Sequence, residues 1–482
     1  MRQPGPREAQ RAFATFANGS SENTKLDLSG GGFEKANITI TAKKGPTGDG
    51  MVNIGFVDST GRDLKNLTIK GDLGRIVAGD ADPILNPPPL AAAGIISVRS
   101  MGRLGTDTQE GGGTLNSVFS GALVSLNVQS DVINSNLIVQ GADTAFIGSV
   151  NIGGSLIGSS IFSSGSVFRA GMGAIKIGGD IQGGSTDLSG SIRSLGSIKS
   201  VTVGGSVMGG TGSRTGLISS DASLGPVKIG KNLTGGSITG TTGNLDQSGY
   251  IQSVTGLISS VAIGGSVISG IDSSTGGALT KNASIRSGGS LFYGSIGSLS
   301  VKGSLIGNSN PNGNSPVIIT AGGSENQGTS RDLVIGKIAI GGRVENTQIL
   351  AGFTVNLAPR YADPEIGSVT VGGDWIGSSI AAGVIDGGDG FGNPNDVTMS
   401  GPGITDEPTR HSIIGSIRIK GEAFGTPNSV NVLDHFGFVA REIRSVRIGG
   451  KTFPLTAGKS NDQLLVGLPV GPIDDFRVLE VA

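Results

Sequence analysis

A seven-residue pattern of apolar and small positions recurs along the chain and predicts its principal strands. Two apolar residues flank one variable residue, Gly-Gly follows, and a polar and an apolar residue complete the motif, as in Val150-Asn151-Ile152-Gly153-Gly154-Ser155-Leu156. Apolar residues two apart point to the same side of a strand, so Val150 and Ile152 should face one interior. We expect the glycine pair to permit positive φ values, which would turn the chain and bring Leu156 to the same interior.

Clear copies of this motif recur over most of the chain. They begin at Val150, Ile175, Val201, Val227, Val261, Leu299, Ile338, Val369, Ile417 and Val446, with weaker copies at Leu67 and Leu126. From Leu126 to Val227 successive copies start 24 to 26 residues apart, and the later gaps of 29 to 48 residues indicate the same unit with inserted loops. Self-similarity at such a period is typical of a solenoid, in which each repeat packs on its neighbours.

Further short apolar elements between the copies complete the predicted repeat. Examples are Ser191-Ile192, Ile198 and Leu217-Ile218. Three short strands and three turns in about 25 residues fit one coil of a parallel β-solenoid, whose coils stack ~4.8 Å apart. Helix-crossover α/β repeats are the alternative, but the intervening segments hold too few helix-forming residues. The predicted fold is all-β: a single parallel β-solenoid with right-handed, three-sided coils of about 25 residues and a cap at each end.

Boundaries follow from where the motif starts, stops and is interrupted. The predicted solenoid spans residues 65–452, and polar insertions rich in Gly, Pro and Asn occupy 308–332, 353–366 and 386–412. Residues 1–64 lack the motif but contain alternating stretches at 25–28, 36–42 and 51–57, which we expect to form an N-terminal cap. Residues 453–482 form the predicted C-terminal cap, whose last strand, at 476–481, would cover the open sheet edge and limit polymerisation.

Composition narrows the classes of protein to which such a fold can belong. Glycine supplies 87 of 482 residues, about 18%, without the period of three of collagen, and this density excludes a mainly helical protein. Hydrophobic residues make up 36% and charged residues 15%, which is too apolar for a disordered chain. A net charge of -1 and only 4% aromatic residues argue against nucleic acid or an anionic membrane surface as a partner.

The absence of cysteine excludes disulfides and thiolate metal sites and is compatible with export. No signal peptide is visible, because residues 1–16 carry three arginines but no apolar segment of the kind that such a peptide requires. No apolar run of about 18 residues occurs, so no membrane span is predicted.

Several segments outside the simple motif carry a resemblance to a known group of proteins. They are Lys70-Gly71-Asp72-Leu73-Gly74-Arg75, Arg99-Ser100-Met101-Gly102-Arg103, Asp434-His435-Phe436-Gly437-Phe438-Val439-Ala440 and the Val-Leu-Glu-Val-Ala end. Together with the many Ile/Val-Gly-Gly-Ser/Asp copies, they resemble a group of uncharacterised, exported, Gly-rich β-helix-repeat proteins of environmental bacteria. The resemblance covers nearly the whole chain. It implies the fold and an extracellular location, and it carries no activity.

Candidate catalytic groups are few. The chain has two histidines, His411 and His435. His435 follows Asp434, but adjacent residues of a strand point to opposite sides, and no Gly-x-Ser-x-Gly nucleophile elbow is present. Gly450-Lys451-Thr452 and Gly458-Lys459-Ser460 match the end of a phosphate-binding loop but lack its first glycine. We therefore expect structural or solvent-facing roles for both histidines and no cofactor-binding loop.

One loop carries a cluster of hard oxygen ligands. Asp386, Asp389, Asn393, Asn395 and Asp396 lie in a Gly-rich stretch, and Ca²⁺ prefers carboxylate and amide oxygens. The stretch matches the Gly-Gly-x-Gly-x-Asp calcium nonapeptide only in part, because Gly392 stands where the aspartate should be, and it does not recur. The alternative is a solvated loop without an ion. Calcium is therefore the one candidate cofactor.

The variable residue between the paired apolar positions predicts an outward-facing row along the solenoid. The row comprises Lys70, Asn127, Asn151, Lys176, Thr202, Lys228, Ala262, Ser300, Ala339, Thr370, Arg418 and Arg447. A polysaccharide lyase or hydrolase needs carboxylates or calcium ligands and a base along such a face, and this row has no carboxylate and no aromatic residue. Threonine occurs in it only at Thr202 and Thr370, so a flat threonine ladder for binding ice is not predicted.

These observations favour a non-enzymatic extracellular structural protein, either a rigid surface element or a subunit of an extracellular fibre or layer. The alternative is an adhesin or glycan-binding β-helix that uses the inserted loops, since loops on a rigid scaffold commonly carry binding sites. A polysaccharide lyase or hydrolase is the third hypothesis. We expect an extracellular or cell-surface location, end-to-end or lateral self-association and a surface polysaccharide as a candidate partner.

Overall fold

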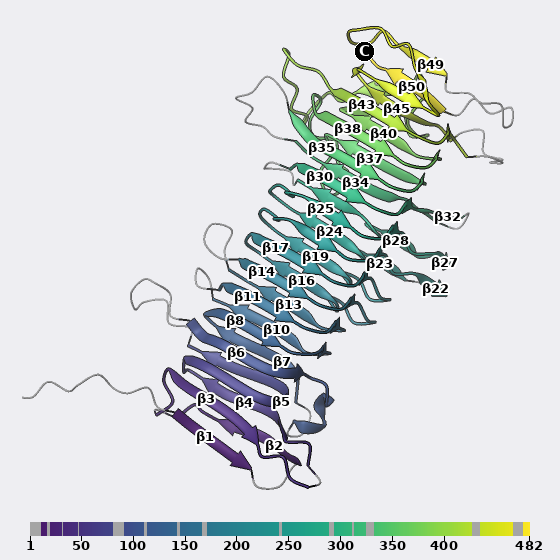
Figure 1. The fold of residues 1–482 in the computed structure, drawn as a ribbon. Helices are drawn as coiled ribbons and strands as arrows, with labels where there is room; N and C mark the ends of the chain where they lie inside the picture. The colour runs from purple at the N-terminus through teal and green to yellow at the C-terminus, as the bar shows by residue number, and fades with distance from the viewer. Residues whose placement is uncertain are drawn as a thin grey trace, which may run out of the picture. The chain divides into compact units, whose positions relative to one another are not determined.

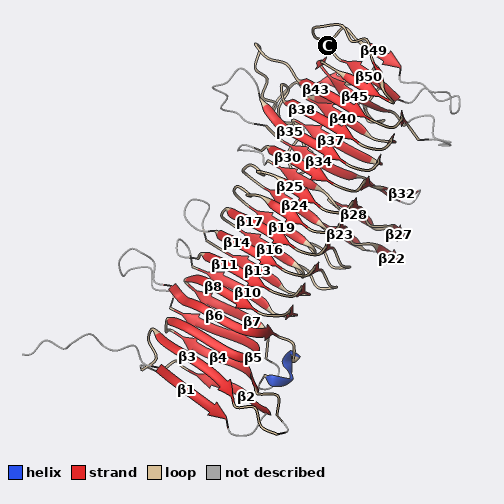
Figure 2. Ribbon diagram, viewed as in Figure 1, coloured by secondary structure: helices blue, strands red, loops and turns tan. Residues whose placement is uncertain are grey.

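Strands and turns make up nearly all of the chain that the computed structural model describes. It describes residues 11–16, 20–30, 32–46, 48–80, 91–109, 113–141, 145–165, 171–240, 243–288, 294–310, 313–323, 332–426, 434–465 and 476–482. Within these ranges there is a single short 3-10 helix, η1 (Gly105–Thr108), shown in blue in Figure 2. The prediction of an all-β fold is confirmed, and no described helix is long and apolar enough to cross a membrane. The chain divides into two compact units, residues 1–205 and 206–482.

In unit 1, residues 1–205, each strand pairs in parallel with its counterpart in the next repeat (Figure 1). The first row of strands is β1 (Arg11–Phe16), β3 (Ala36–Ala42), β5 (Leu64–Gly79), β6 (Ala91–Met101), β8 (Ala122–Val128), β11 (Ile147–Ile152), β14 (Met172–Ile177) and β17 (Ile198–Val203). The second row ends in β9 (Val132–Ile133), β12 (Leu156–Ile157) and β15 (Ile181–Gln182). The third row contains β2 (Ser20–Asp27), β4 (Met51–Thr60), the end of β5, β7 (Asn116–Ser120), β10 (Asn136–Gln140), β13 (Ser160–Ser163) and β16 (Ser191–Ser194).

Unit 2, residues 206–482, repeats the same three rows with shorter strands. The first row is β20 (Val227–Ile229), β25 (Val261–Ile263), β30 (Ile296–Val301), β35 (Leu333–Ile340), β38 (Glu365–Val371), β43 (Ile413–Ile419), β46 (Glu442–Ile443) and β47 (Val446–Ile448). The second is β18 (Val207–Met208), β21 (Leu233–Thr234), β26 (Val267–Ile268), β31 (Leu305–Ile306), β36 (Val344–Glu345), β39 (Trp375–Ile376) and β44 (Ala423–Phe424). The third is β19 (Leu217–Ser220), β24 (Tyr250–Ser253), β29 (Ile285–Ser287), β34 (Val317–Ala321), β37 (Thr347–Ala351), β40 (Ser379–Ala382), β45 (Phe436–Ala440) and β50 (Phe476–Glu480).

Short strand pairs project from unit 2. Two are parallel, β22 (Ile238–Gly240) with β27 (Asp272–Ser274) and β23 (Asn244–Asp246) with β28 (Ala278–Thr280). Two are antiparallel, β32 (Asn308–Asn310) with β33 (Gly313–Ser315) and β41 (Val384–Ile385) with β42 (Val397–Thr398). The predicted insertion 308–332 is not a loop throughout: after the hairpin, Val317–Ala321 form β34, a buried strand of the third row. Residues 324–331 of this segment lie outside the described residues.

The motif copies identified in the sequence lie in register with one another. Val150 pairs with Leu126 on one side and Ile175 on the other, and Val369 pairs with Ile338 and Ile417 in the same way. All six side chains are at most 2% exposed, so the paired apolar positions form aliphatic ladders in the interior. The motif therefore predicted both the strands and the parallel pairing, as in a β-solenoid.

The glycine pairs act differently from our expectation. Gly153, Gly178 and Gly372 do not have the positive φ that we predicted. A Cβ atom on any of them would instead overlap a backbone carbonyl oxygen of the preceding repeat, as Gly178 would with that of Gly153. The pairs are therefore required by the close approach of stacked corners. Positive φ is found at the last copy, at Gly449 and Gly450.

The polar residue that follows each glycine pair links one repeat to the next. In unit 1 the backbone N–H of Ser155 donates to the Asp131 carboxylate (2.7 Å), and that of Asp180 donates to the Ser155 hydroxyl (3.0 Å). In unit 2 the N–H of Ser304 donates to the Ser266 hydroxyl in the same way (3.0 Å). A short polar side chain at this corner thus satisfies a backbone donor that the turn leaves without a strand partner.

The predicted outward row is aligned by the strand register, with one correction. Asn127, Asn151, Lys176 and Thr202 pair in sequence, as do the members from Lys228 to Arg447. Lys70 does not belong to this row. Thr68 is the residue between the inward-facing pair of β5, and it aligns with Ser97 and Thr39. The row at its N-terminal end is therefore hydroxyl-bearing rather than basic.

Two of the three predicted insertions fold back onto unit 2. The outward side chains of the third row from β37 to β50, including Leu350 and Val439, join a buried apolar cluster with Phe353, Phe391 and Met399 of the insertions. Met399 is fully buried and Phe391 is 4% exposed. Parts of segments 353–366 and 386–412 therefore cover the outer side of the third row, and we call them the cover. Their apolar side chains and the outward side chains of the strands form a second hydrophobic core.

The strand edges at the C-terminal end carry antiparallel strands. β48 (Lys451–Thr452) pairs with β47, and β49 (Gln463–Leu465) pairs with the last strand, β50. β50 itself extends the third row in parallel, as predicted for residues 476–481. The interior beneath it holds an aromatic group in which Phe438 contacts Trp375 and Phe476 edge to face, with ring centroids 5.3 and 5.1 Å apart.

Candidate functional site

The predicted calcium loop lies against the start of strand β45. Gly390 and Gly392 have positive φ, and a Cβ atom on them would overlap the carbonyl oxygens of His435 and Phe436. The side chain of Phe391, between them, enters the apolar cluster. The glycines of this stretch are therefore explained by close packing and left-handed backbone.

Several of the candidate ligand oxygens in this loop already have hydrogen-bond partners. The Asp389 carboxylate accepts from the side-chain amides of Asn393 (2.8 Å) and Asn395 (3.2 Å), and these bonds hold the pKa of Asp389 below its ordinary value. Asn393 Oδ1 accepts from the backbone N–H of Asn395 (2.9 Å). Asp386 acts on this group through its charge, which contributes to the raised pKa of Asp396. Among the described residues, no group of three or more His, Asp or Glu side chains is placed to hold a metal ion.

Asp396 is the chemically unusual residue of the loop. It is 5% exposed, and its Oδ2 accepts from the backbone N–H groups of Gly392 (2.6 Å) and Asn393 (3.2 Å). Its Oδ1 has no partner among the described residues. Burial raises the pKa of Asp396 to about 7, with smaller contributions from the charges of Asp386 and Asp389. Calcium binding at this loop stays a prediction. The ligand atom that it would use first is Asp396 Oδ1, because this oxygen has no hydrogen-bond partner among the described residues.

The two histidines occupy separate places and contact different carboxylates. His435 Nε2 lies 3.9 Å from Asp389 Oδ2, whereas the adjacent Asp434 accepts from the Thr426 hydroxyl (2.8 Å). His411 Nε2 lies 2.7 Å from Glu442 Oε2. The Asp434–His435 pair considered from the sequence is thus engaged with two different neighbours.

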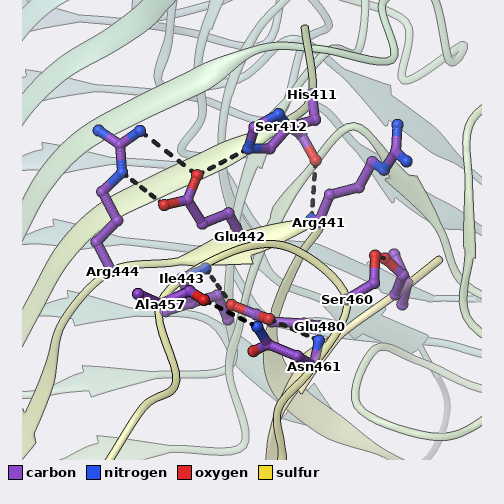
Figure 3. Close-up of polar contacts among 11 residues, drawn as sticks. His411, Ser412, Arg441, Glu442, Ile443, Arg444, Ala457, Ser460, Asn461 and Glu480 are labelled. Atoms are coloured by element: carbon purple, nitrogen blue, oxygen red, sulfur yellow. Dashed lines mark hydrogen bonds and ion pairs between the residues drawn. The ribbon is translucent and has the colours of Figure 1, made fainter.

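Figure 3 shows the polar contacts around His411, which join the end of the chain to the first row of unit 2. Hydrogen bonds from Arg444 (2.9 Å) and then His411 hold the pKa of Glu442 below its ordinary value, against the opposite effect of partial burial. Glu480 accepts from the backbone N–H groups of Ile443 (2.7 Å) and Asn461 (3.0 Å). Burial raises the pKa of Glu480. The network fastens β50 to the preceding strands.

Unit 1 contains a cavity of about 300 Å³ that brings together two of the segments singled out in the sequence. Its wall includes Asp72 from Lys70–Arg75 and Arg99, Ser100 and Arg103 from Arg99–Arg103. Asp49, Met51, Asn53 and Leu104 complete the wall. Sequence reasoning gave this place no role.

A buried carboxylate organises the cavity. Asp72 is 5% exposed and accepts from the Ser100 hydroxyl (2.6 Å) and from the backbone N–H groups of Arg103 (3.2 Å) and Leu104 (3.3 Å). Its own N–H donates to Asn53 Oδ1 (2.9 Å). These bonds satisfy the Asp72 carboxylate and fix the turn that carries Arg103.

The two arginines of the cavity are not engaged by its acids. The Arg99 guanidinium contacts the Met51 sulfur, and Arg103 is exposed. Within the described parts of the chain, neither guanidinium forms an ion pair. The sequence signal that could have revealed them is the pair of arginines on either side of Ser100-Met101-Gly102, because most clear copies of the motif have glycine at the position of Arg99.

Comparisons with protein-family models, curated proteins and solved structures give no match for the chain. The geometry of the described residues is therefore the basis of the functional argument.

Proposed function

We propose that this protein is a non-enzymatic extracellular structural protein, a rigid surface element or a subunit of a fibre or layer. The observation that carries the proposal is the use of the insertions: segments 353–366 and 386–412 contribute Phe353, Phe391 and Met399 to a second core. Insertions in a β-helix that form a binding or catalytic groove leave polar groups facing solvent, whereas these stiffen the scaffold.

The finer architecture belongs to the same proposal. Parallel strands joined by crossovers in one sheet are right-handed in nearly all proteins, which supports a right-handed coil with three sides. The antiparallel pairing of β49 with β50 supports a cap at 453–482. A cap at 1–64 has no such support, because β1 to β4 extend the first and third rows in parallel. The absence of cysteine and the resemblance described above support export.

Self-association is proposed through lateral contacts. β48 and β49 occupy strand edges at the C-terminal end of unit 2, and an occupied edge does not template the addition of another chain. Lateral association of weakly charged molecules meets little repulsion, since the net charge is -1.

Electron microscopy and light scattering of the purified chain test this proposal. We expect elongated particles that associate side by side and no unlimited end-to-end growth. Removal of residues 453–482 would take away β49 and β50 and expose the edge of β45, so the truncated chain should form long end-to-end filaments at the same concentration. Compact globular particles from the full chain, or strict end-to-end growth before truncation, would contradict the proposal.

The adhesin or glycan-binding alternative finds its support outside the inserted loops, in the arginine-lined cavity of unit 1.

A further inference from the structure

We propose that the cavity of unit 1 binds a hydroxylated carboxylate of monosaccharide size, with its carboxylate held between Arg99 and Arg103. This inference does not depend on the structural role proposed above. It rests on the two guanidiniums, which form no ion pair with any described residue, on the carboxylate that positions one of them, and on the size and wall of the cavity.

The arginines are suited to this ligand because a guanidinium presents parallel N–H donors that match the two oxygens of a carboxylate. Arg99 extends from strand β6 and Arg103 from the turn that follows it. Since Asp72 is satisfied by Ser100 Oγ and two backbone N–H groups, it positions Arg103 without neutralising either guanidinium. An anion from solution can therefore pair with them.

The rest of the wall favours hydroxyl groups on the same ligand. Asp49 Oδ1 accepts from the Met51 N–H (2.9 Å), which leaves the second carboxylate oxygen of this exposed residue to accept from a hydroxyl. Met51 and Leu104 supply apolar surface of the kind that the carbon face of a sugar covers. An inorganic phosphate or sulfate has no carbon surface to cover Met51 and Leu104, so the wall favours a carboxylate that also carries hydroxyl groups on a carbon skeleton.

The volume of about 300 Å³ corresponds to one sugar-sized molecule. The same chemistry occurs in a free sugar acid and in one residue of an acidic polysaccharide. The two sources share the carboxylate and hydroxyl groups, and they differ in whether the ligand continues beyond the cavity.

Isothermal titration calorimetry with the full chain tests the proposal. The probes are D-galacturonate and an oligogalacturonide, with D-galactose and a neutral oligogalactan as controls, each up to ~10 mM to cover weak affinities. We expect the acidic probes to bind and the neutral ones not to bind. Similar affinity for both acidic probes would indicate a free sugar acid or a chain end, and binding of the oligomer alone would indicate an internal polysaccharide residue.

Variants separate the site from general electrostatics. Arg99→Gln and Arg103→Gln should each weaken binding about tenfold or more, because a charge-assisted hydrogen-bond pair is lost. Arg103→Lys should recover only part of the affinity, since an ammonium cannot bind a carboxylate through a planar fork. Arg418→Gln, at an exposed position of the outward row of unit 2, is the matched control and should bind as the original chain does.

Circular dichroism and unfolding curves establish that each variant is folded. The proposal is overturned if neither acidic probe binds, if D-galactose binds as well as D-galacturonate, or if both Arg99→Gln and Arg103→Gln bind normally.

Discussion

The outer side of the third row differs between the two units although both units contain the same three rows of strands. In unit 1 the row Val118, Ile138, Phe162 and Arg193 is aligned by strand pairing and half-buried, and the Arg193 guanidinium lies 4.8 Å from the Phe162 ring centroid. In unit 2 the row Arg286, Thr320, Leu350, Ala381 and Val439 is at most 3% exposed.

The difference comes from the connections and not from the strands. In unit 2 the chain makes long excursions after β37 and β40 and returns over the outward side chains. In unit 1 only residues 141–146 separate β10 from β11, and only residues 195–197 separate β16 from β17. The apolar outward residues and the apolar residues of the excursions therefore depend on each other. A repeat can gain stability in this way without any change in its interior ladders.

Truncating the side chain at equivalent outward positions of the two units should produce the largest difference in stability. Leu350→Ala removes a side chain that is 3% exposed beneath the insertions, and we expect a loss of about 2 to 4 kcal/mol in the free energy of unfolding. Ile138→Ala removes a half-buried side chain in unit 1 and should cost about 1 kcal/mol or less. Unfolding in guanidinium chloride measures the loss of stability of each variant, and hydrogen exchange assigns the loss to unit 1 or unit 2. Equal losses would mean that the insertions do not act as a core.

The two outward arginines give a second, smaller contrast. Arg286 is 3% exposed, and its Nη1 donates to the carbonyl oxygen of Val355 in the cover (2.9 Å); burial lowers the pKa of Arg286. Arg286→Ala should cost about 2 kcal/mol because the carbonyl loses a charged donor, and it should speed hydrogen exchange in residues 353–358. Arg286→Met, which restores volume without burying a charge, should cost less. Arg193→Ala, the counterpart at a half-buried position, should change stability by about 0.5 kcal/mol at most.

A further expected effect is a pH dependence in the cover of unit 2. The folded pKa of Asp396, about 7, lies above its ordinary value, so the folded protein binds more protons than the unfolded chain between pH ~4 and pH 7. Stability of segment 386–412 should therefore fall as the pH rises through this window and level off above pH ~7. Asp396→Asn should remove the dependence, and hydrogen exchange of this segment at pH 5 and pH 8, corrected for intrinsic rates, measures it.

The same measurement tests calcium. An ion that binds Asp396 Oδ1 stabilises the charged carboxylate, so added Ca²⁺ should slow exchange in the loop at pH 8 and not in Asp396→Asn. A pH response that persists in Asp396→Asn would assign the effect to another group, such as Glu480, whose pKa burial also raises.

The strand pattern of this protein was predictable because the interior repeats. Val150 and Ile175 are equivalent by sequence, and the strand register makes them neighbours. The same reasoning failed at Lys70, because strand β5 departs from the motif and places Thr68 in the outward row. It also assigned positive φ to the glycine pairs, since a sequence does not show that a carbonyl of the preceding repeat lies where the Cβ of Gly178 would be.

The candidate sites were harder to predict because their partners are distant in sequence. The oxygen-bearing residues of the loop from Asp386 to Asp396 identified it as a candidate site. They did not predict that Gly390 and Gly392 pack against the start of β45. The cavity of unit 1 combines Asp49, Asp72 and Arg103 from three successive strand segments, and nothing in their local sequences links them. Phe391 and Met399 were hints that a polar insertion was partly a core.

The sequence by itself determined the all-β class, the aliphatic ladders and the places where the repeat is interrupted. It could do so because these follow from the spacing of apolar and glycine residues, which is local and repeated. Only the tertiary structure decided that the insertions of unit 2 cover its strands, that Asp396 is buried with one unpartnered oxygen, and that Arg99 and Arg103 share a cavity. Those outcomes depend on contacts between segments that do not repeat, and such contacts become visible only when the chain is folded.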